Sequence, residues 1–220
     1  PFIEQKNLYD NFNFNQATDN QNYPGTTRAL ASTIVKSYVC PSDNNKDLRN
    51  NLAIANYSAS VGSSGRNDNA ACPCPRWNNW GSLQEMPVRA VTNASHFSGP
   101  FTRYPVSTRF ADMTDGLSNT IFFGEVRRDC SVHVQNGWVR SNNSQGLACT
   151  VIPMNIDTCK DSSTDGCQRP CNWSLELGFK SLHPNGAMFL FGDGGVRFMP
   201  NNIDHRNYQY LGGKADGQAG

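Results

Sequence analysis

The feature that most constrains this chain is its set of eight cysteines. They are Cys40, Cys72, Cys74, Cys130, Cys149, Cys159, Cys167 and Cys171. An even number of cysteines in a chain poor in lysine and glutamate is typical of disulfide-bonded proteins in an oxidising compartment. We therefore expect disulfides, whose connectivity stays open because eight cysteines allow many pairings.

The alternative use of these cysteines is a zinc site. The pairs Cys72-Pro-Cys74 and Cys167-x3-Cys171 would each supply two thiolates, and the histidine nearest to the second pair is His183. The Cys-x2-Cys spacing typical of structural zinc sites does not occur. Disulfides are therefore the favoured interpretation.

The charge of the chain excludes a broad nucleic-acid interface. It carries 19 Lys and Arg against 18 Asp and Glu, and its longest basic cluster is Arg127-Arg128. Phosphate binding needs larger clusters of basic side chains. The sequence holds no run of about 18 apolar residues, so we expect membrane contact only through a targeting helix upstream of Pro1.

The hydrophobic pattern predicts one α+β domain over residues 1–220. Residues 63–110 and 127–175 are predicted to be loop-rich insertions that are braced by disulfides because they cannot build much core. Helices are expected over 1–12 and 26–39, and strands over 57–62, 119–126 and, more weakly, 137–140.

The clearest local pattern lies near the C-terminus. Apolar residues 187–191 and 196–199 flank Gly192-Asp193-Gly194-Gly195, which predicts a β-hairpin in an antiparallel sheet. After it, Asp204 is expected to cap a short helix that turns Tyr208 and Leu211 inward and ends at Gly212-Gly213.

His183 and Asp193 are the pair that most resembles an acid-base couple. If residues 187–191 form a straight strand, it is roughly 13 Å long, and the two side chains lie at its opposite ends. We therefore expect structural roles, with His183 bonded to a loop carbonyl and Asp193 to its own turn amides. The chain also lacks a Gly-x-Ser-x-Gly elbow and a His-Glu-x-x-His helix, so we do not expect an enzyme.

Two further groups suggest ligands. Asp112, Asp115 and Asn119 around Gly116 offer oxygen ligands for calcium, although an Asx-turn leading into the next strand is the favoured interpretation, so we expect no cofactor. Trp77 and Trp80, with two asparagines between them, suit either sugar stacking or a cover over a small disulfide core.

Several blocks resemble the bacterial pilin-like proteins that carry a C-terminal H-x9-D-G signature, the prepilin-processing-associated group. The signature would be His183 to Asp193-Gly194, preceded by Phe179-Lys-Ser-Leu and followed by Gly195-Val-Arg-Phe198. The other matching blocks, in the family's order, are Pro1-Phe-Ile-Glu-Gln5 with Leu8-Tyr9, Tyr38-Val-Cys40-Pro-Ser-Asp43, Asp115-Gly116-Leu-Ser-Asn119-Thr120 through Glu125, and Lys214-Ala-Asp-Gly217.

This resemblance implies a type IV pilin or type II pseudopilin architecture. In such proteins a peptidase trims a leader, an apolar helix anchors and then polymerises the subunit, and a globular β-domain faces outward. The implied function is a non-enzymatic structural subunit, secreted or at the cell surface or in the periplasm, that self-associates into an extracellular filament or a type II secretion-like pseudopilus. The alternative is a module that binds a surface ligand or carbohydrate around Trp77 and Trp80.

Overall fold

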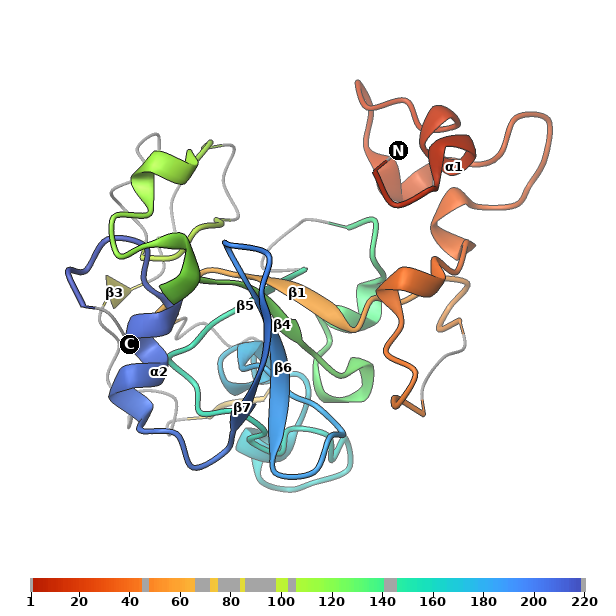
Figure 1. Ribbon diagram of the computed structural model, residues 1–220. Coiled ribbons are helices and arrows are strands. Elements are labelled where there is room, and N and C mark those ends of the chain that lie inside the picture. Colours follow the sequence, from red (N-terminus) through yellow and green to blue (C-terminus); the bar gives the residue numbers. More distant parts are fainter. Residues whose placement is uncertain are drawn as a thin grey trace.

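A five-stranded sheet forms the centre of the protein, in a computed structural model that describes residues 2–44, 48–65, 72–74, 84–85, 98–102, 106–140 and 146–218. Its strands, in spatial order, are β5 (Leu147–Ala148), β1 (Tyr57–Ser60), β4 (Ile121–Glu125), β6 (Gly186–Phe191) and β7 (Val196–Pro200) (Figure 1). The predicted α+β class is confirmed.

The pairing of the strands differs in one place from the expected antiparallel sheet. β1 with β4, β4 with β6 and β6 with β7 are antiparallel, whereas β5 runs parallel to β1. A parallel neighbour requires a long crossover connection, and here the chain from β1 to β5, which includes β4, supplies it. A separate parallel pair joins β2 (Ser64–Gly65) to β3 (Gln84–Glu85).

The predicted C-terminal hairpin is confirmed. β6 and β7 pair in continuous register. In the turn, Asp193 Oδ1 accepts the N–H of Gly195 at 2.8 Å, and Gly194 has a φ of 84°. This left-handed conformation carries no steric cost for glycine. Asp193 therefore has the turn-amide role that the sequence predicts.

The main core packs α2 (His205–Gly212) against the sheet. Phe179 and Phe189 are fully buried, with ring centroids 5.1 Å apart, and Tyr208 of α2 is 1% exposed beside them. A Cβ at Gly124 would lie 2.6 Å from both phenylalanine rings, so β4 needs glycine at this position. The two rings can therefore pack over β4 only because residue 124 is a glycine.

The expected features of α2 are confirmed. Asp204 precedes the helix, and its Oδ1 accepts the N–H of Asn207 at 2.9 Å. Tyr208 is buried, Leu211 packs half-buried against the core, and the helix ends at Gly212. Among the described residues, no helix has the length and apolar character needed to cross a bilayer.

The predicted helix over 26–39 is wrong. Two short 3-10 turns, Leu30–Ser32 and Lys36–Tyr38, take its place, and Thr33 and Val35 between them have extended backbones. Thr33, Ile34 and Val35 are consecutive β-branched residues, which lose side-chain freedom in a helix. Helical spacing of the apolar residues therefore did not produce a helix.

The helix expected over 1–12 forms as the short α1 (Lys6–Asp10). The weak strand expected over 137–140 is a turn instead, because Trp138 turns inward and its Nε1 donates to the carbonyl of Thr33 at 3.0 Å. The remaining 3-10 turns among the described residues are Thr18–Asn20, Phe110–Asp112, Leu117–Asn119, Arg128–Cys130, Val134–Asn136, Gly166–Gln168 and Leu175–Leu177.

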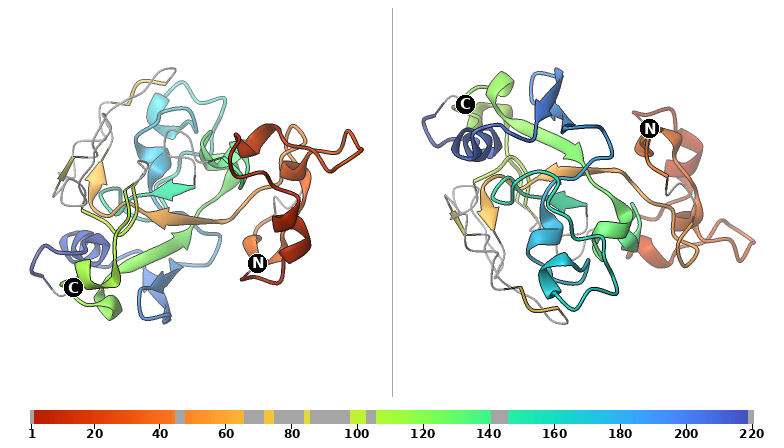
Figure 2. Two further views of the ribbon diagram at one scale, coloured as in Figure 1. Left: turned by 90° about the horizontal axis from the view of Figure 1, so that it is seen from above. Right: turned by 90° about the horizontal axis from the view of Figure 1, so that it is seen from below.

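Residues 2–44 form an N-terminal lobe with its own small core. Leu8, Leu30 and Val35 are buried there, and Phe12 and Trp138 pack against them. In Figure 2 the lobe lies at one end of the sheet and the C-terminal segment at the other in both views. Trp138 belongs to the second insertion, so the insertion supplies part of the lobe's core.

The second insertion, 127–175, builds more core than expected. Val151, Ile152 and Leu175 are each at most 2% exposed and form a second cluster with Val61. The prediction that this stretch cannot build much core is therefore wrong. Apolar residues isolated among polar ones meet in space, although no periodic pattern marks them in the sequence.

Two of the three disulfides join the two insertions, and the third lies within residues 127–175. They link Cys72 to Cys171, Cys74 to Cys167, and Cys130 to Cys159. The two cysteine pairs that were considered for zinc are therefore cross-linked to each other. Structural disulfides of this kind indicate an oxidising compartment.

The prediction of disulfides for all eight cysteines is wrong for two of them. Cys40 and Cys149 are free, buried thiols. Cys149 packs in the second apolar cluster, and Cys40 lies beside the carboxylate of Glu125.

The two disulfides at Cys72 and Cys74 should stabilise the fold non-additively. They close nested loops with sequence separations of 99 and 93 residues, so either one alone restricts nearly the same unfolded chain. Loops of this size are worth about 4 kcal/mol by chain entropy. We expect the joint loss, with all four cysteines changed to alanine, to exceed the sum of the two single-pair losses by about 2 kcal/mol.

Guanidinium denaturation of the three variants and the wild type measures these losses. A joint loss equal to the sum of the single losses to within about 0.5 kcal/mol would show that the two bridges act independently.

Candidate functional site

Three residues from distant parts of the chain meet at the end of β4. Glu125 is the last residue of β4, Cys40 follows the turn Lys36–Tyr38 of the N-terminal lobe, and His183 lies in the loop before β6. Cys40 and Glu125 are buried, whereas the side chain of His183 is 33% exposed. We call these three residues the Glu125 cluster.

One carboxylate oxygen is the centre of the Glu125 cluster. Glu125 Oε1 lies 3.2 Å from His183 Nε2 and 3.6 Å from Cys40 Sγ. The other oxygen, Oε2, accepts the backbone N–H of Met188 in β6 at 2.8 Å. In the part of the chain that the structure describes, no other group of three His, Cys, Asp or Glu brings its ligand atoms so close together.

A buried amide holds Cys40 in place. Asn56 Oδ1 accepts the N–H of Cys40 at 2.9 Å, and Asn56 Nδ2 donates to Asp43 Oδ2 at 2.7 Å and to the carbonyl of Val126 at 3.2 Å. Sequence reasoning missed Asn56. The available signal was the Cys-Pro-Ser-Asp block, whose first and last residues both bond to this amide.

The cluster affects a neighbouring tyrosine. Burial, and after it the nearby Cys40 and Glu125, together raise the pKa of Tyr57 to about 12. A cavity of about 10 Å³ adjoins the cluster and is lined by Cys40, Asn56 and Glu125 among others. A cavity of this size has room for about one water molecule.

The expected role of His183 needs correction. Its partner is the carboxylate of Glu125 and not a loop carbonyl, because the loop before β6 passes beside the end of β4. A cysteine nucleophile would need the imidazole between thiol and acid. Here the acid lies between the thiol and the imidazole, because Glu125 Oε1 contacts both of them. The three side chains therefore lie together as a group of potential ligands, not as a nucleophile with its base.

Asp193, which follows the other end of β6, has a separate role. Besides the turn amide, its Oδ2 lies 3.2 Å from a guanidinium nitrogen of Arg197. Sequence reasoning thus placed the two residues of the signature correctly at opposite ends of the strand but found only one of their partners.

The carboxylate oxygens considered for calcium are bonded to donors of the protein itself. The two carboxylate oxygens of Asp115 accept the N–H groups of Asp216 and Gly217 at 2.7 and 2.9 Å. Asp112 pairs with Arg109 at 2.9 Å, and this hydrogen bond lowers the pKa of Asp112. Asn119 Nδ2 donates to the carbonyl of Asp115 at 3.0 Å.

This second site is a junction of two segments. Gly116, with a φ of 95°, turns the chain between Asp115 and the 3-10 turn that leads into β4. Asp115 therefore fixes the segment after α2 to the start of β4. Trp77 and Trp80, the candidates for sugar stacking, lie outside the described residues.

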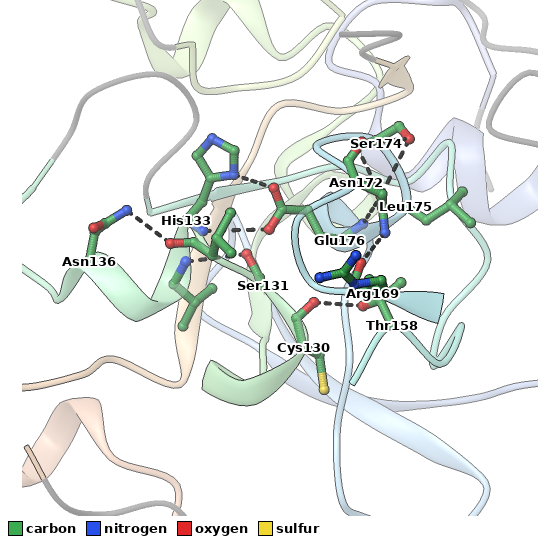
Figure 3. Close-up of polar contacts among 12 residues, drawn as sticks. Cys130, Ser131, His133, Asn136, Thr158, Arg169, Asn172, Ser174, Leu175 and Glu176 are labelled. Atoms are coloured by element: carbon green, nitrogen blue, oxygen red, sulfur yellow. Dashed lines mark hydrogen bonds and ion pairs between the residues drawn. The ribbon is translucent and has the colours of Figure 1, made fainter. Parts of the chain in front are cut away.

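A second buried polar network, which sequence reasoning missed, joins the insertion 127–175 to Glu176, the residue after it (Figure 3). Glu176 is 2% exposed and contacts His133 Nδ1 with its carboxylate, while its N–H donates to Asn172 Oδ1 at 3.1 Å. Asn172 also accepts the N–H of Ser174 at 3.1 Å. No spacing in the sequence links residue 133 to residue 176.

Lys180 connects this network to the Glu125 cluster. Its ammonium donates to the carbonyls of Leu175, Glu176 and Gly178 at 2.9 to 3.2 Å, and its N–H donates to the carbonyl of Glu125 at 2.8 Å. Burial lowers the pKa of Lys180 to about 8, and the charge of Glu176 partly opposes this effect.

The lowered pKa of Lys180 should make the stability depend on pH. Between about pH 8 and pH 10.5 the unfolded chain binds more protons than the folded chain, so stability rises with pH in this window. Relative to Lys180→Met, which has no such group, the wild type should gain up to about 3 kcal/mol across it.

Urea denaturation of both proteins at several pH values in this window gives the difference directly. Titration of other groups, such as Cys149 with its raised pKa, occurs in both proteins and largely cancels. Parallel stability curves for the two proteins would mean that Lys180 keeps an ordinary pKa in the folded state.

Comparison with known proteins identifies the family of the chain. A family model described as "Protein of unknown function (DUF1559)" matches residues 1–206. No curated protein and no solved structure matches the chain significantly. The matched residues include all three members of the Glu125 cluster, the hairpin and the whole N-terminal lobe. The chain belongs to this DUF1559 family.

Proposed function

We propose that this chain is the globular part of an exported, non-enzymatic, pilin-like structural subunit that self-associates into an extracellular filament or a type II secretion-like pseudopilus. The resemblance of its ordered sequence blocks to pilin-like proteins is the first support. The second is what those blocks do. Asp115, Glu125 and Asp193 each bind backbone amides of the protein itself, which suits blocks that specify a fold.

An exported location is supported by the disulfides. Two of them cross-link the insertions and the third lies within the second insertion, and such bonds persist in oxidising compartments. The extracellular space, the cell surface and the periplasm all meet this requirement, and a filament subunit would pass through or remain in one of them.

The observation that carries the proposal is the apolar surface of the N-terminal lobe. Phe2, Tyr9, Phe14 and Ile34 are 99%, 45%, 57% and 47% exposed. Two of them, Tyr9 and Phe14, line a groove of about 390 Å³ together with Leu8. A concentration of exposed apolar side chains marks an interaction site.

A second, different surface would complete a head-to-tail contact. β7 is an edge strand of the sheet, and its Val196 and Phe198 are 60% and 48% exposed. An open filament forms when two unlike patches on each subunit fit each other. The lobe and the β7 edge are two such unlike patches.

The alternative function is a module that binds a surface ligand or carbohydrate. The same groove favours it, because Tyr9, Phe12, Tyr38 and Trp138 line the wall and aromatic rings of this kind stack on apolar faces of ligands. The two functions differ in the occupant of the groove, which is a second copy of the chain in one case and a small ligand in the other.

Self-association of the purified chain tests the proposal. We expect sedimentation velocity to show concentration-dependent oligomers for the wild type, and the variant Phe2→Ser/Phe14→Ser to need at least about 10-fold higher concentration, since a few exposed aromatic anchors dominate such contacts. Phe110→Ser is the matched control, because Phe110 is 66% exposed but lies outside the lobe.

Electron microscopy of cells that lack the protein is the second arm of the experiment. Loss of surface fibres, restored by the wild type and by Phe110→Ser but not by the lobe variant, would support the filament. The proposal would be overturned if the purified chain stays monomeric and cells that lack the protein keep their fibres. Glycan binding by that monomer, reduced by Tyr9→Ala, Trp77→Ala or Trp80→Ala, would instead favour the alternative.

A further inference from the structure

We propose that the Glu125 cluster, formed by Cys40, Glu125 and His183, is a Zn²⁺ site. Thiolate, imidazole and carboxylate are the three ligand types that zinc takes from proteins. Thiolates and imidazoles together favour zinc over the harder cations calcium and magnesium, which take oxygen ligands. The site is independent of filament assembly, because all three ligands come from one chain.

The two distances from Glu125 Oε1 to the other ligand atoms fit a tetrahedral ion. Ordinary zinc bond lengths at tetrahedral angles separate a nitrogen from an oxygen ligand by about 3.4 Å and a sulfur from an oxygen ligand by about 3.6 Å. The corresponding distances from Glu125 Oε1 are 3.2 Å to His183 Nε2 and 3.6 Å to Cys40 Sγ. All three ligand atoms lie within 4.8 Å of one another.

The hydrogen bonds around the cluster leave the ligand atoms directed at one point. Glu125 Oε2 is occupied by the N–H of Met188, which orients Oε1 toward the other two ligands. Asn56 holds the backbone of Cys40 and is itself held by Asp43. Zinc ligands characteristically have such outer partners, and losing one weakens metal binding about 10- to 100-fold.

The charges of the cluster suit a divalent cation. A Cys40 thiolate and the Glu125 carboxylate together would neutralise Zn²⁺, and the buried carboxylate of Asp43 lies behind Asn56. Lys180 also lines the adjoining cavity, but its ammonium donates to three backbone carbonyls. Its positive charge is therefore engaged elsewhere.

A zinc site also accounts for the free thiol of Cys40. The chain carries three disulfides, yet Cys40 stays unpaired among the described cysteines. A thiolate bound to zinc is protected from the oxidation that forms disulfides. Partial exposure of His183 gives the ion a path to the site, and the cavity of about 10 Å³ leaves room for a water as fourth ligand.

Zinc binding is measured on the purified, oxidised chain after dialysis against a chelator. We expect isothermal titration with Zn²⁺ to give one ion per chain, and elemental analysis after gel filtration to give the same ratio. Co²⁺ in place of Zn²⁺ should produce a thiolate-to-cobalt charge-transfer absorption, because Cys40 is a direct ligand.

Ligand variants locate the site. Loss of an outer partner weakens metal binding about 10- to 100-fold, so Cys40→Ser, Glu125→Gln and His183→Asn should each weaken zinc binding by at least as much. Cys40→Ser should also abolish the charge-transfer absorption. The matched controls are Cys149→Ala and His205→Asn, a free thiol and a histidine outside the cluster. Both should bind zinc like the wild type.

Thiol alkylation followed by mass spectrometry keeps the test valid if a ligand variant fails to fold. In the wild type, Zn²⁺ should slow alkylation of Cys40 at least about 10-fold and leave Cys149 unchanged. The proposal is overturned if the wild type binds no zinc, if the control variants lose as much affinity as the ligand variants, or if zinc does not protect Cys40.

Discussion

Burying a carboxylate costs several kcal/mol unless its oxygens find partners, and Glu125 is 3% exposed at the end of β4, the central strand of the sheet. Its partners come from both ends of the chain. Cys40 belongs to the N-terminal lobe, and His183 and Met188 belong to the segment that enters β6. Satisfying this one group therefore fixes the lobe, the central strand and the C-terminal hairpin relative to one another.

The residue next to Glu125 connects this polar junction to the apolar core. Gly124 has no side chain, and the rings of Phe179 and Phe189 close over it. A larger residue there would push Phe179 away, and Lys180, the residue after Phe179, is the one whose N–H bonds to the carbonyl of Glu125. Core packing and the polar junction thus depend on the same short stretch of β4.

Local patterns in the sequence were sufficient to predict part of this structure. The Asp193 turn and the Asp204 cap are made by residues close in sequence, so their chemistry predicts them. Glu125, His133 and Cys40 each bond to residues that are distant in sequence, and no periodicity encodes these contacts. Recognisable blocks marked Cys40, Glu125 and His183 one by one, but only the folded chain shows that they meet.

A double-mutant cycle between Glu125 and His183 tests most directly whether the carboxylate joins these segments. The free energies of unfolding of the wild type, Glu125→Gln, His183→Asn and the double variant are measured in the presence of a chelator, so that metal does not contribute. If the contact is formed as described, the cycle gives a coupling energy of about 1 to 3 kcal/mol. Losses that add to within about 0.5 kcal/mol would contradict the account, because the two side chains would then stabilise the fold separately.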